Sequence, residues 1–154
     1  MGDETSLPAG SELQRWVRLR RRLSAPPERV FRAWSDPDEL ARWFPERVEG
    51  GMAVGFRSTL VWPERRIWWD VLEAADRRFV FRWPWLADER LVTTVHVLVQ
   101  PVGAGSLLEL EDGPFPLDQP GVLDAWAEAI EGWSEALALL RACLDFSVDL
   151  RLQG

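Results

Sequence analysis

One short segment of the chain places four aromatic side chains on the same face of a β-strand. Residues 79–85 read Phe-Val-Phe-Arg-Trp-Pro-Trp. Successive side chains of a strand point to opposite faces, so the two Phe and the two Trp residues share one face. They are Phe79, Phe81, Trp83 and Trp85. Because so much apolar surface is unfavourable in water, the fold must supply a large apolar partner for this strand.

A long amphipathic helix, from Gly121 to about Phe146, is the candidate partner. Its apolar residues recur at spacings of three and four and form one continuous stripe. The stripe consists of Leu123, Trp126, Ile130, Trp133, Leu137, Leu140 and Leu144. A coiled coil is the alternative interpretation, but the stripe spans only about three heptads. A helix on an aromatic sheet predicts either a cavity for an apolar ligand or a core that the rings themselves fill.

The rest of the chain is typical of an antiparallel meander that follows one strand and two short helices. The first strand is expected at residues 16–24, and prolines mark helix starts at Pro26-Pro27 and at Asp36-Pro37. Alternating segments joined by tight connections follow. They are residues 54–62, 66–74, 78–85, 89–100 and 106–112, and a strand near 46–49 would make seven. Pro114, Pro116 and Pro120 predict an extended connection to the last helix.

Length and composition favour one globular domain and exclude several functional classes. The chain has 154 residues, of which 47% are hydrophobic, and no apolar run reaches the roughly 18 residues of a membrane span. The net charge of −7 argues against nonspecific nucleic-acid binding. Residues 1–12 lack the pattern of a signal peptide, so a cytoplasmic location is expected. The expected organisation is a flexible leader (1–14), a single domain (15–148) and a C-terminal tail (149–154).

Few residues of this chain suit catalysis or metal binding. One His and one Cys exclude a His- or Cys-rich metal site and an intrachain disulfide. The alternation of residues 94–98 places His96 on the outer face of the sheet, and Cys143 lies off the helix stripe. No lysine is available for a Schiff base. We therefore expect no metal, no cofactor and no catalytic residue.

The order of elements and several motifs resemble a known family. Residues 25–34 read Ala-Pro-Pro-Glu-Arg-Val-Phe-Arg-Ala-Trp, and Asp36-Pro37 and Leu-Ala-Arg-Trp-Phe at 40–44 follow. This opening resembles that of the homologues of the activator of heat-shock protein 90 ATPase, a family of the START-like (SRPBCC) superfamily. Weaker landmarks follow at Trp69-x-Val71-x-Glu73, in the aromatic strand, at residues 105–110 and at Gly132-Trp133. The resemblance covers about residues 16–146.

The resemblance implies an α+β helix-grip fold, in which a seven-stranded antiparallel sheet wraps around a long C-terminal helix and a cavity lies between them. It implies little about chemistry, because the superfamily includes lipid carriers, receptors, cyclases, hydroxylase domains and co-chaperone domains. We expect noncatalytic binding of a small apolar or aromatic molecule. The alternatives are a cyclase- or hydrolase-type enzyme and a protein-interaction or chaperone-regulating module. A chaperone partner is less favoured, because the leader before Trp16 is too short for the extra domain of eukaryotic co-chaperones.

One polar pair stands out among the residues expected at the ligand site. Arg21 and Asp112 are polar exceptions on the otherwise apolar inner faces of the first and last strands. In the family that this chain resembles, many members carry a His where the last strand ends, and this chain has Asp112 there. We expect the two side chains to lie close together, as an ion pair or as a handle for the polar end of a ligand. The expected ligand-binding residues are Arg21, Trp43, Phe56, Trp69, Phe79, Phe81, Trp83, Trp85, Leu110, Asp112, Trp126, Ile130 and Trp133.

Overall fold

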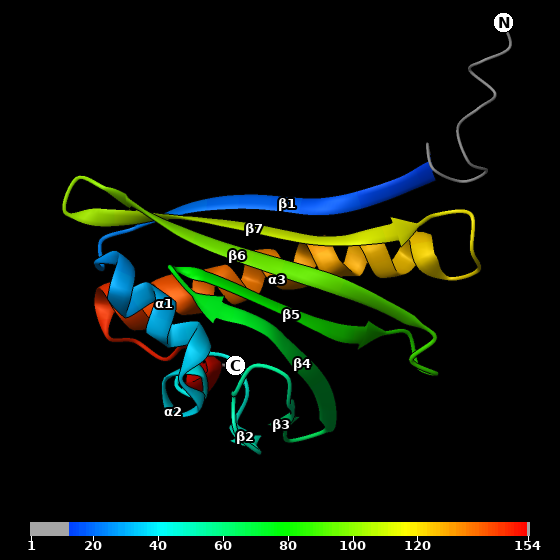
Figure 1. Cartoon of the computed structure of the whole chain (residues 1–154), viewed down its shortest axis with the longest axis horizontal. Coiled ribbons are helices and arrows are strands. Elements are labelled where there is room, and N and C mark those ends of the chain that lie inside the picture. Colours follow the sequence, from blue (N-terminus) through cyan, green and yellow to red (C-terminus); the bar gives the residue numbers. More distant parts are fainter. Residues whose placement is uncertain (1–12, 154) are drawn as a thin grey trace, which may run out of the picture.

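The structure, a computed structural model, describes residues 13–153 and has the predicted helix-grip architecture. A seven-stranded antiparallel sheet curves around one long helix (Figure 1). The elements are β1 (Gln14–Leu23), α1 (Pro27–Ser35), α2 (Pro37–Leu40), β2 (Arg47–Glu49), β3 (Arg57–Trp62), β4 (Arg65–Ala75), β5 (Arg78–Trp85), β6 (Leu91–Val102), β7 (Gly105–Pro116), α3 (Val122–Phe146) and the 3-10 helix η3 (Leu150–Gln153). The strand order is β1-β7-β6-β5-β4-β3-β2, so the first strand pairs with the last.

The two short helices begin where the prolines predict. Pro27 occupies the first turn of α1, and Pro37 that of α2. The Asp36 carboxylate caps α2 by accepting hydrogen bonds from the backbone N–H groups of Asp38 (2.9 Å) and Glu39 (3.1 Å). The indole of Trp43 then donates to the carbonyl of Ala33 at 2.9 Å, which ties the segment after α2 to α1.

Helix α3 has the predicted bounds, but its buried face differs from the predicted stripe. Leu123 is 56% exposed, and Trp126, Ile130 and Leu144 are only half-buried. The buried residues are Val122, Ala125, Ala129, Trp133, Ala136, Leu137, Leu140 and Cys143. Small alanine side chains therefore take much of the buried face, which lets the helix approach a sheet that already carries bulky rings. The prediction that Cys143 lies off the buried stripe is wrong.

Strand β7 continues through Pro116, although the prolines predicted a connection there. The register shifts between Arg15 and Val17 of β1, so Gly113 and Pro114 lie opposite Trp16 as a bulge. Proline is tolerated at bulges, where a ladder hydrogen bond is not required. Gly113 is required by close packing, because a Cβ there would lie 2.5 Å from Cδ1 of Trp16.

The last described residues pack against the body of the domain. Arg151 donates hydrogen bonds to the carbonyl oxygens of Pro45 (2.6 Å) and Arg42 (2.7 Å) and forms an ion pair with Asp149 (2.8 Å). The chain end therefore lies beside α2 (Figure 1). Of the predicted leader, residues 1–12 lie outside the described residues, and Gln14 begins β1. Within the described residues, no helix is long and apolar enough to cross a bilayer.

Candidate functional site

Aromatic rings fill most of the space between the sheet and α3. The ring centroids of Trp69 and Phe81 are 4.0 Å apart, and those of Trp34 and Trp43 are 4.9 Å apart. The fully buried rings are Trp34, Trp43, Trp69, Trp133, Phe79, Phe81 and Phe115. The deep interior therefore matches the filled-core alternative, and the open space lies at one side of it.

Two open pockets form a groove between α3 and the β3–β5 side of the sheet. They share Phe44, Arg65 and Gly132, which therefore mark the point where the two pockets meet. The first, which we name the tryptophan pocket, has a volume of about 520 Å³ and is lined by Phe44, Arg65, Arg66, Ile67, Trp83, Pro84, Trp85, Leu86, Ala87, Glu89, Glu128, Gly132 and Trp133. The second, the side pocket, has a volume of about 580 Å³ and is also lined by Glu46, Trp62, Pro63, Glu135, Ala136, Leu139, Asp149 and Arg151.

A glycine in the middle of α3 lies where the two pockets meet. A Cβ at Gly132 would have no neighbouring side chain or other segment within 4 Å. Glycine inside a helix costs roughly 1 kcal/mol relative to alanine. Since Gly132 lines both pockets, open space adjoins α3 at this position, and a large side chain there would enter the groove.

A buried carboxylate lies behind the aromatic wall of the tryptophan pocket. Asp112 has no exposed surface, and its Oδ2 accepts a hydrogen bond from Nε1 of Trp133 at 2.9 Å. Burial raises the pKa of Asp112 to about 6, against opposing hydrogen bonds from Thr93, Trp133, Trp83 and Trp85. Within the described residues, Oδ1 of Asp112 and Nε1 of Trp83 lack a hydrogen bond of good geometry, although the two groups are close enough to affect this pKa.

The predicted pair of Arg21 and Asp112 does not form. Both residues are on the inner-facing positions of their strands, but Arg21 lies opposite Leu108 whereas Asp112 lies opposite Val17. Val17 and Arg21 are four positions apart on β1, which is about 13 Å along a strand. Arg21 instead donates to the carbonyl oxygen of Arg20 at 2.8 Å. The alternation of side chains correctly predicted that both residues face inward. The distance between them depends on the register of β1 against β7, which alternation does not give.

The other predicted site residues are divided between the pocket wall, the core and the surface. Trp83, Trp85 and Trp133 line the tryptophan pocket. Trp43, Trp69, Phe79, Phe81 and Leu110 are buried in the core, and Trp126 and Ile130 are half-buried on α3. Phe56 is 67% exposed and precedes β3, so it contributes to neither pocket.

Sequence reasoning missed several residues of the groove. Phe44 belongs to the family-like opening motif and Ile67 to an expected strand, and neither is among the expected ligand-binding residues. Gly132 is one of the family landmarks, and a glycine within a helix is a signal for close packing or open space. Glu89 was placed at the start of a strand, whereas the structure places it in the turn before β6 with φ of 58°.

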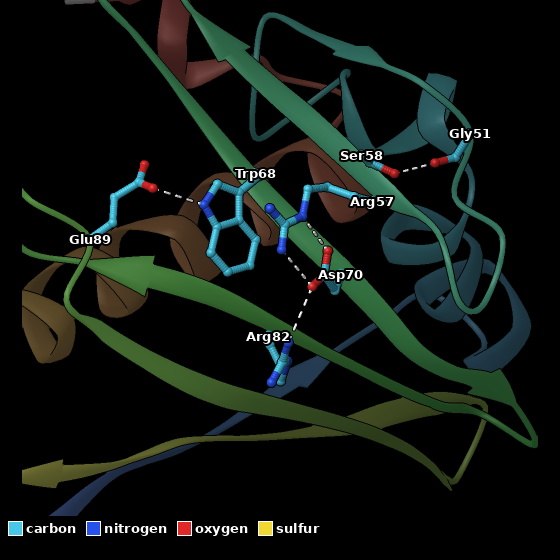
Figure 2. Close-up of polar contacts among 7 residues, drawn as sticks. All are labelled: Gly51, Arg57, Ser58, Trp68, Asp70, Arg82 and Glu89. Carbon is cyan, nitrogen blue, oxygen red and sulfur yellow. Dashed lines mark hydrogen bonds and ion pairs between the residues drawn. The ribbon is translucent and has the colours of Figure 1, made fainter.

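The outer face of β3, β4 and β5 carries a network of ion pairs and hydrogen bonds around the indole of Trp68 (Figure 2). Arg57 donates two hydrogen bonds to Asp70, at 2.7 and 3.0 Å, and Arg82 approaches the same carboxylate at 3.4 Å. The guanidinium of Arg57 also lies 3.9 Å from the ring centroid of Trp68. Trp68 in turn donates to Glu89 at 3.1 Å, so the outer face holds a residue of the pocket rim.

The sequence comparison agrees with this architecture. The sequence profile of the family described as activator of Hsp90 ATPase homolog 1-like protein matches residues 24–145. The chain belongs to this family. No curated protein sequence matches it significantly.

Solved structures place this member of the Hsp90 ATPase activator homologue family among bacterial proteins of the same fold. Protein MLL2253 from Mesorhizobium loti is 24% identical with a TM-score of 0.74, over 84% of this chain and 96% of that one. CalU16 from Micromonospora echinospora is 26% identical with a TM-score of 0.68, over 82% and 74%. The Aha1 dimer from Colwellia psychrerythraea is 14% identical with a TM-score of 0.73, over 86% and 97%. The first and third likenesses concern the fold alone.

Proposed function

We propose that the protein binds a small, mostly apolar ligand in the tryptophan pocket without converting it. The observation that carries this proposal is the orientation of the pocket's indoles. Nε1 of Trp133 donates to Asp112, and Nε1 of Trp85 donates to Thr93 at 2.9 Å. The N–H groups of these two rings are therefore satisfied inside the protein, and the rings present carbon surface to the pocket. A volume of about 520 Å³ is within the range of small-molecule sites.

The residues around the tryptophan pocket favour binding over the enzyme alternative. Among the described residues that line it there is no serine, cysteine or histidine that could serve as a nucleophile or as a base near pH 7. His96 is exposed on the outer face of β6, and Cys143 is buried on α3 away from both pockets. Cyclase- or hydrolase-type chemistry therefore has less support than binding.

Substitution of Gly132 tests the proposed site. The neutral apolar dye N-phenyl-1-naphthylamine should bind the wild-type protein saturably, with a rise in dye emission. Gly132→Phe should weaken dye binding by at least about tenfold, which is 1.4 kcal/mol, because the added ring enters the groove. Gly132→Ala is the matched control and should bind within about twofold of wild type. Unchanged binding to a folded Gly132→Phe variant would place the dye elsewhere and reject this site.

An apolar segment of a partner protein is the second candidate occupant. The observation in its favour is that the tryptophan pocket and the side pocket form one open groove, which runs past Phe44 just after α2. Absence of saturable dye binding to the wild-type protein would favour this alternative over a small ligand.

A further inference from the structure

We propose that the tryptophan pocket prefers an organic cation, an ammonium group on an apolar body, and that Asp112 is the buried counter-charge behind the pocket wall. This inference rests on the proposed binding function and adds the charge of the ligand to it. It is carried by the aromatic wall of the pocket and by the buried, unpaired carboxylate of Asp112 behind that wall.

Four rings form a continuous aromatic wall. The ring centroids of Trp133 lie 5.7 Å from Phe44 and 5.0 Å from Trp83, and Trp83 lies 5.5 Å from Trp85. The faces of aromatic rings carry partial negative charge and attract cations, and tryptophan does so most strongly. Quaternary ammonium groups are the ligands that such aromatic sites suit best.

The carboxylate behind this wall has no cation of its own. Among the described residues, Asp112 forms no ion pair, and only burial and hydrogen bonds from Thr93 and the three indoles act on its pKa. Arg21, the expected partner, is displaced along β1 by the register. A negative charge in a poorly polarisable interior acts more strongly on nearby charges than one in water. The hydrogen bond from Trp133 to this anion also enriches the indole ring in electrons, which strengthens its attraction for a cation.

The rim of the pocket holds two carboxylates and two guanidinium groups. Among the described residues, neither Glu89 nor Glu128 forms an ion pair, and Trp68 holds Glu89 at the rim (Figure 2). Each of the two rim arginines has a contact outside the tryptophan pocket. Arg66 pairs with Glu49, and the guanidinium of Arg65 lies 4.7 Å from the ring centroid of Trp62, a residue of the side pocket. The rim charges of Arg65, Arg66, Glu89 and Glu128 therefore balance, and the preference for a cation rests on the aromatic wall and on Asp112.

A matched pair of ligands separates charge from shape. Phenyltrimethylammonium and tert-butylbenzene have the same shape and differ in one central atom, nitrogen or carbon. At pH 8, the cation should displace N-phenyl-1-naphthylamine from the wild-type protein at a concentration at least about fivefold lower than the hydrocarbon. Asp112→Asn should remove most of this preference and leave the hydrocarbon within about twofold. Asp70→Asn, the same change on the outer face, should keep the preference.

The outcomes distinguish the two proposals. If the hydrocarbon competes as well as the cation in the wild-type protein, cation selectivity is overturned while apolar binding stands. If neither ligand nor the dye binds, both proposals fail. A preference that persists unchanged in Asp112→Asn overturns the role of Asp112. Should that variant not fold, the wild-type protein provides the test, because the preference should fall as the pH is lowered from 8 to 5 and Asp112 becomes neutral.

Discussion

Two aspartates of the same sheet have opposite environments because they lie on opposite faces. Asp70, on the outer face of β4, lies between the guanidinium groups of Arg57 and Arg82. Hydrogen bonds from these arginines, Arg57 first, lower the pKa of its carboxyl group. Asp112, on the inner face of β7, is surrounded by indoles and has its pKa raised to about 6 by burial. One carboxylate is solvated and paired, and the other is buried and unpaired.

The difference between the two carboxylates indicates that Asp112, and not Asp70, lowers the stability of the folded protein. A paired surface carboxylate contributes little, because exposed ion pairs are screened by water. A buried carboxylate without a cation is unfavourable whenever it is ionised. Buried groups with strongly shifted pKa values cluster at functional sites, which supports the proposed role of Asp112 in binding. The variants below test this contrast between the two faces.

The largest effect is expected when Asp112 loses its hydrogen-bond donor together with a buried ring. Trp133→Ala should lower the free energy of unfolding by about 3–5 kcal/mol, as is usual for a fully buried tryptophan. Trp133→Phe keeps a ring and removes the N–H group, so its cost should be about 1.5–3 kcal/mol. Urea unfolding at pH 7 measures both. A loss below about 1 kcal/mol for the alanine variant would mean that Trp133 does not pack in the core.

Asp112→Asn should stabilise the protein at neutral pH. The folded-state pKa of about 6 exceeds the ordinary value of 3.8, so the folded protein holds this proton more tightly than the unfolded chain. Stability is therefore lost as the pH rises from about 4 to 6, by roughly 3 kcal/mol in total. The uncharged amide escapes this loss, so the variant should be more stable than wild type at pH 8 and similar to it at pH 4. A variant that is less stable than wild type at pH 8 would contradict an unpaired buried charge.

The outer carboxylate should show the opposite sign and a smaller effect. Asp70→Asn should lower the free energy of unfolding at pH 7 by about 1 kcal/mol or less, because Arg57 and Arg82 are about half exposed. The pKa of Asp70 is lowered, so its stabilising effect is present above pH 3.8 and is lost as the pH falls through the lower folded-state pKa. High salt should reduce the difference between variant and wild type. A loss of stability in Asp70→Asn as large as that in Trp133→Ala would show that solvent exposure does not explain the difference between the two faces of the sheet.

The smallest effect is expected at the outer indole. Trp68→Phe removes the N–H group that Glu89 accepts from, as Trp133→Phe does for Asp112. Water can replace the exposed partner, so the expected cost is below about 0.5 kcal/mol. Thermal unfolding of the two phenylalanine variants side by side gives the comparison directly. Equal losses of stability in Trp68→Phe and Trp133→Phe would contradict the expected difference between the outer and inner faces of the sheet.

Local patterns predicted the fold well because they depend on neighbours in the chain. Proline positions predicted both short helices, alternation predicted the strands, and three/four spacing predicted the bounds of α3. The inward orientation of Asp112 followed from alternation alone. The family resemblance added the order of the elements, which the structure and the profile match confirm.

The errors concern quantities that depend on packing between distant segments. The register of β1 against β7 separates Arg21 from Asp112, and no local pattern encodes it. The buried face of α3 includes alanines, which a search for large apolar residues overlooks. The rings could either leave a cavity or fill it, and this depends on how closely α3 approaches the sheet. Only the assembled structure places the open space beside Gly132.

The anchored chain end has a practical consequence for anyone who labels or immobilises this protein. Arg151 lines the side pocket while it holds the carbonyl oxygens of Arg42 and Pro45. A fluorophore attached beside Arg151 would therefore sit next to the groove and obstruct it. The same proximity makes this end a suitable point for an environment-sensitive dye, whose emission would report when the groove is occupied.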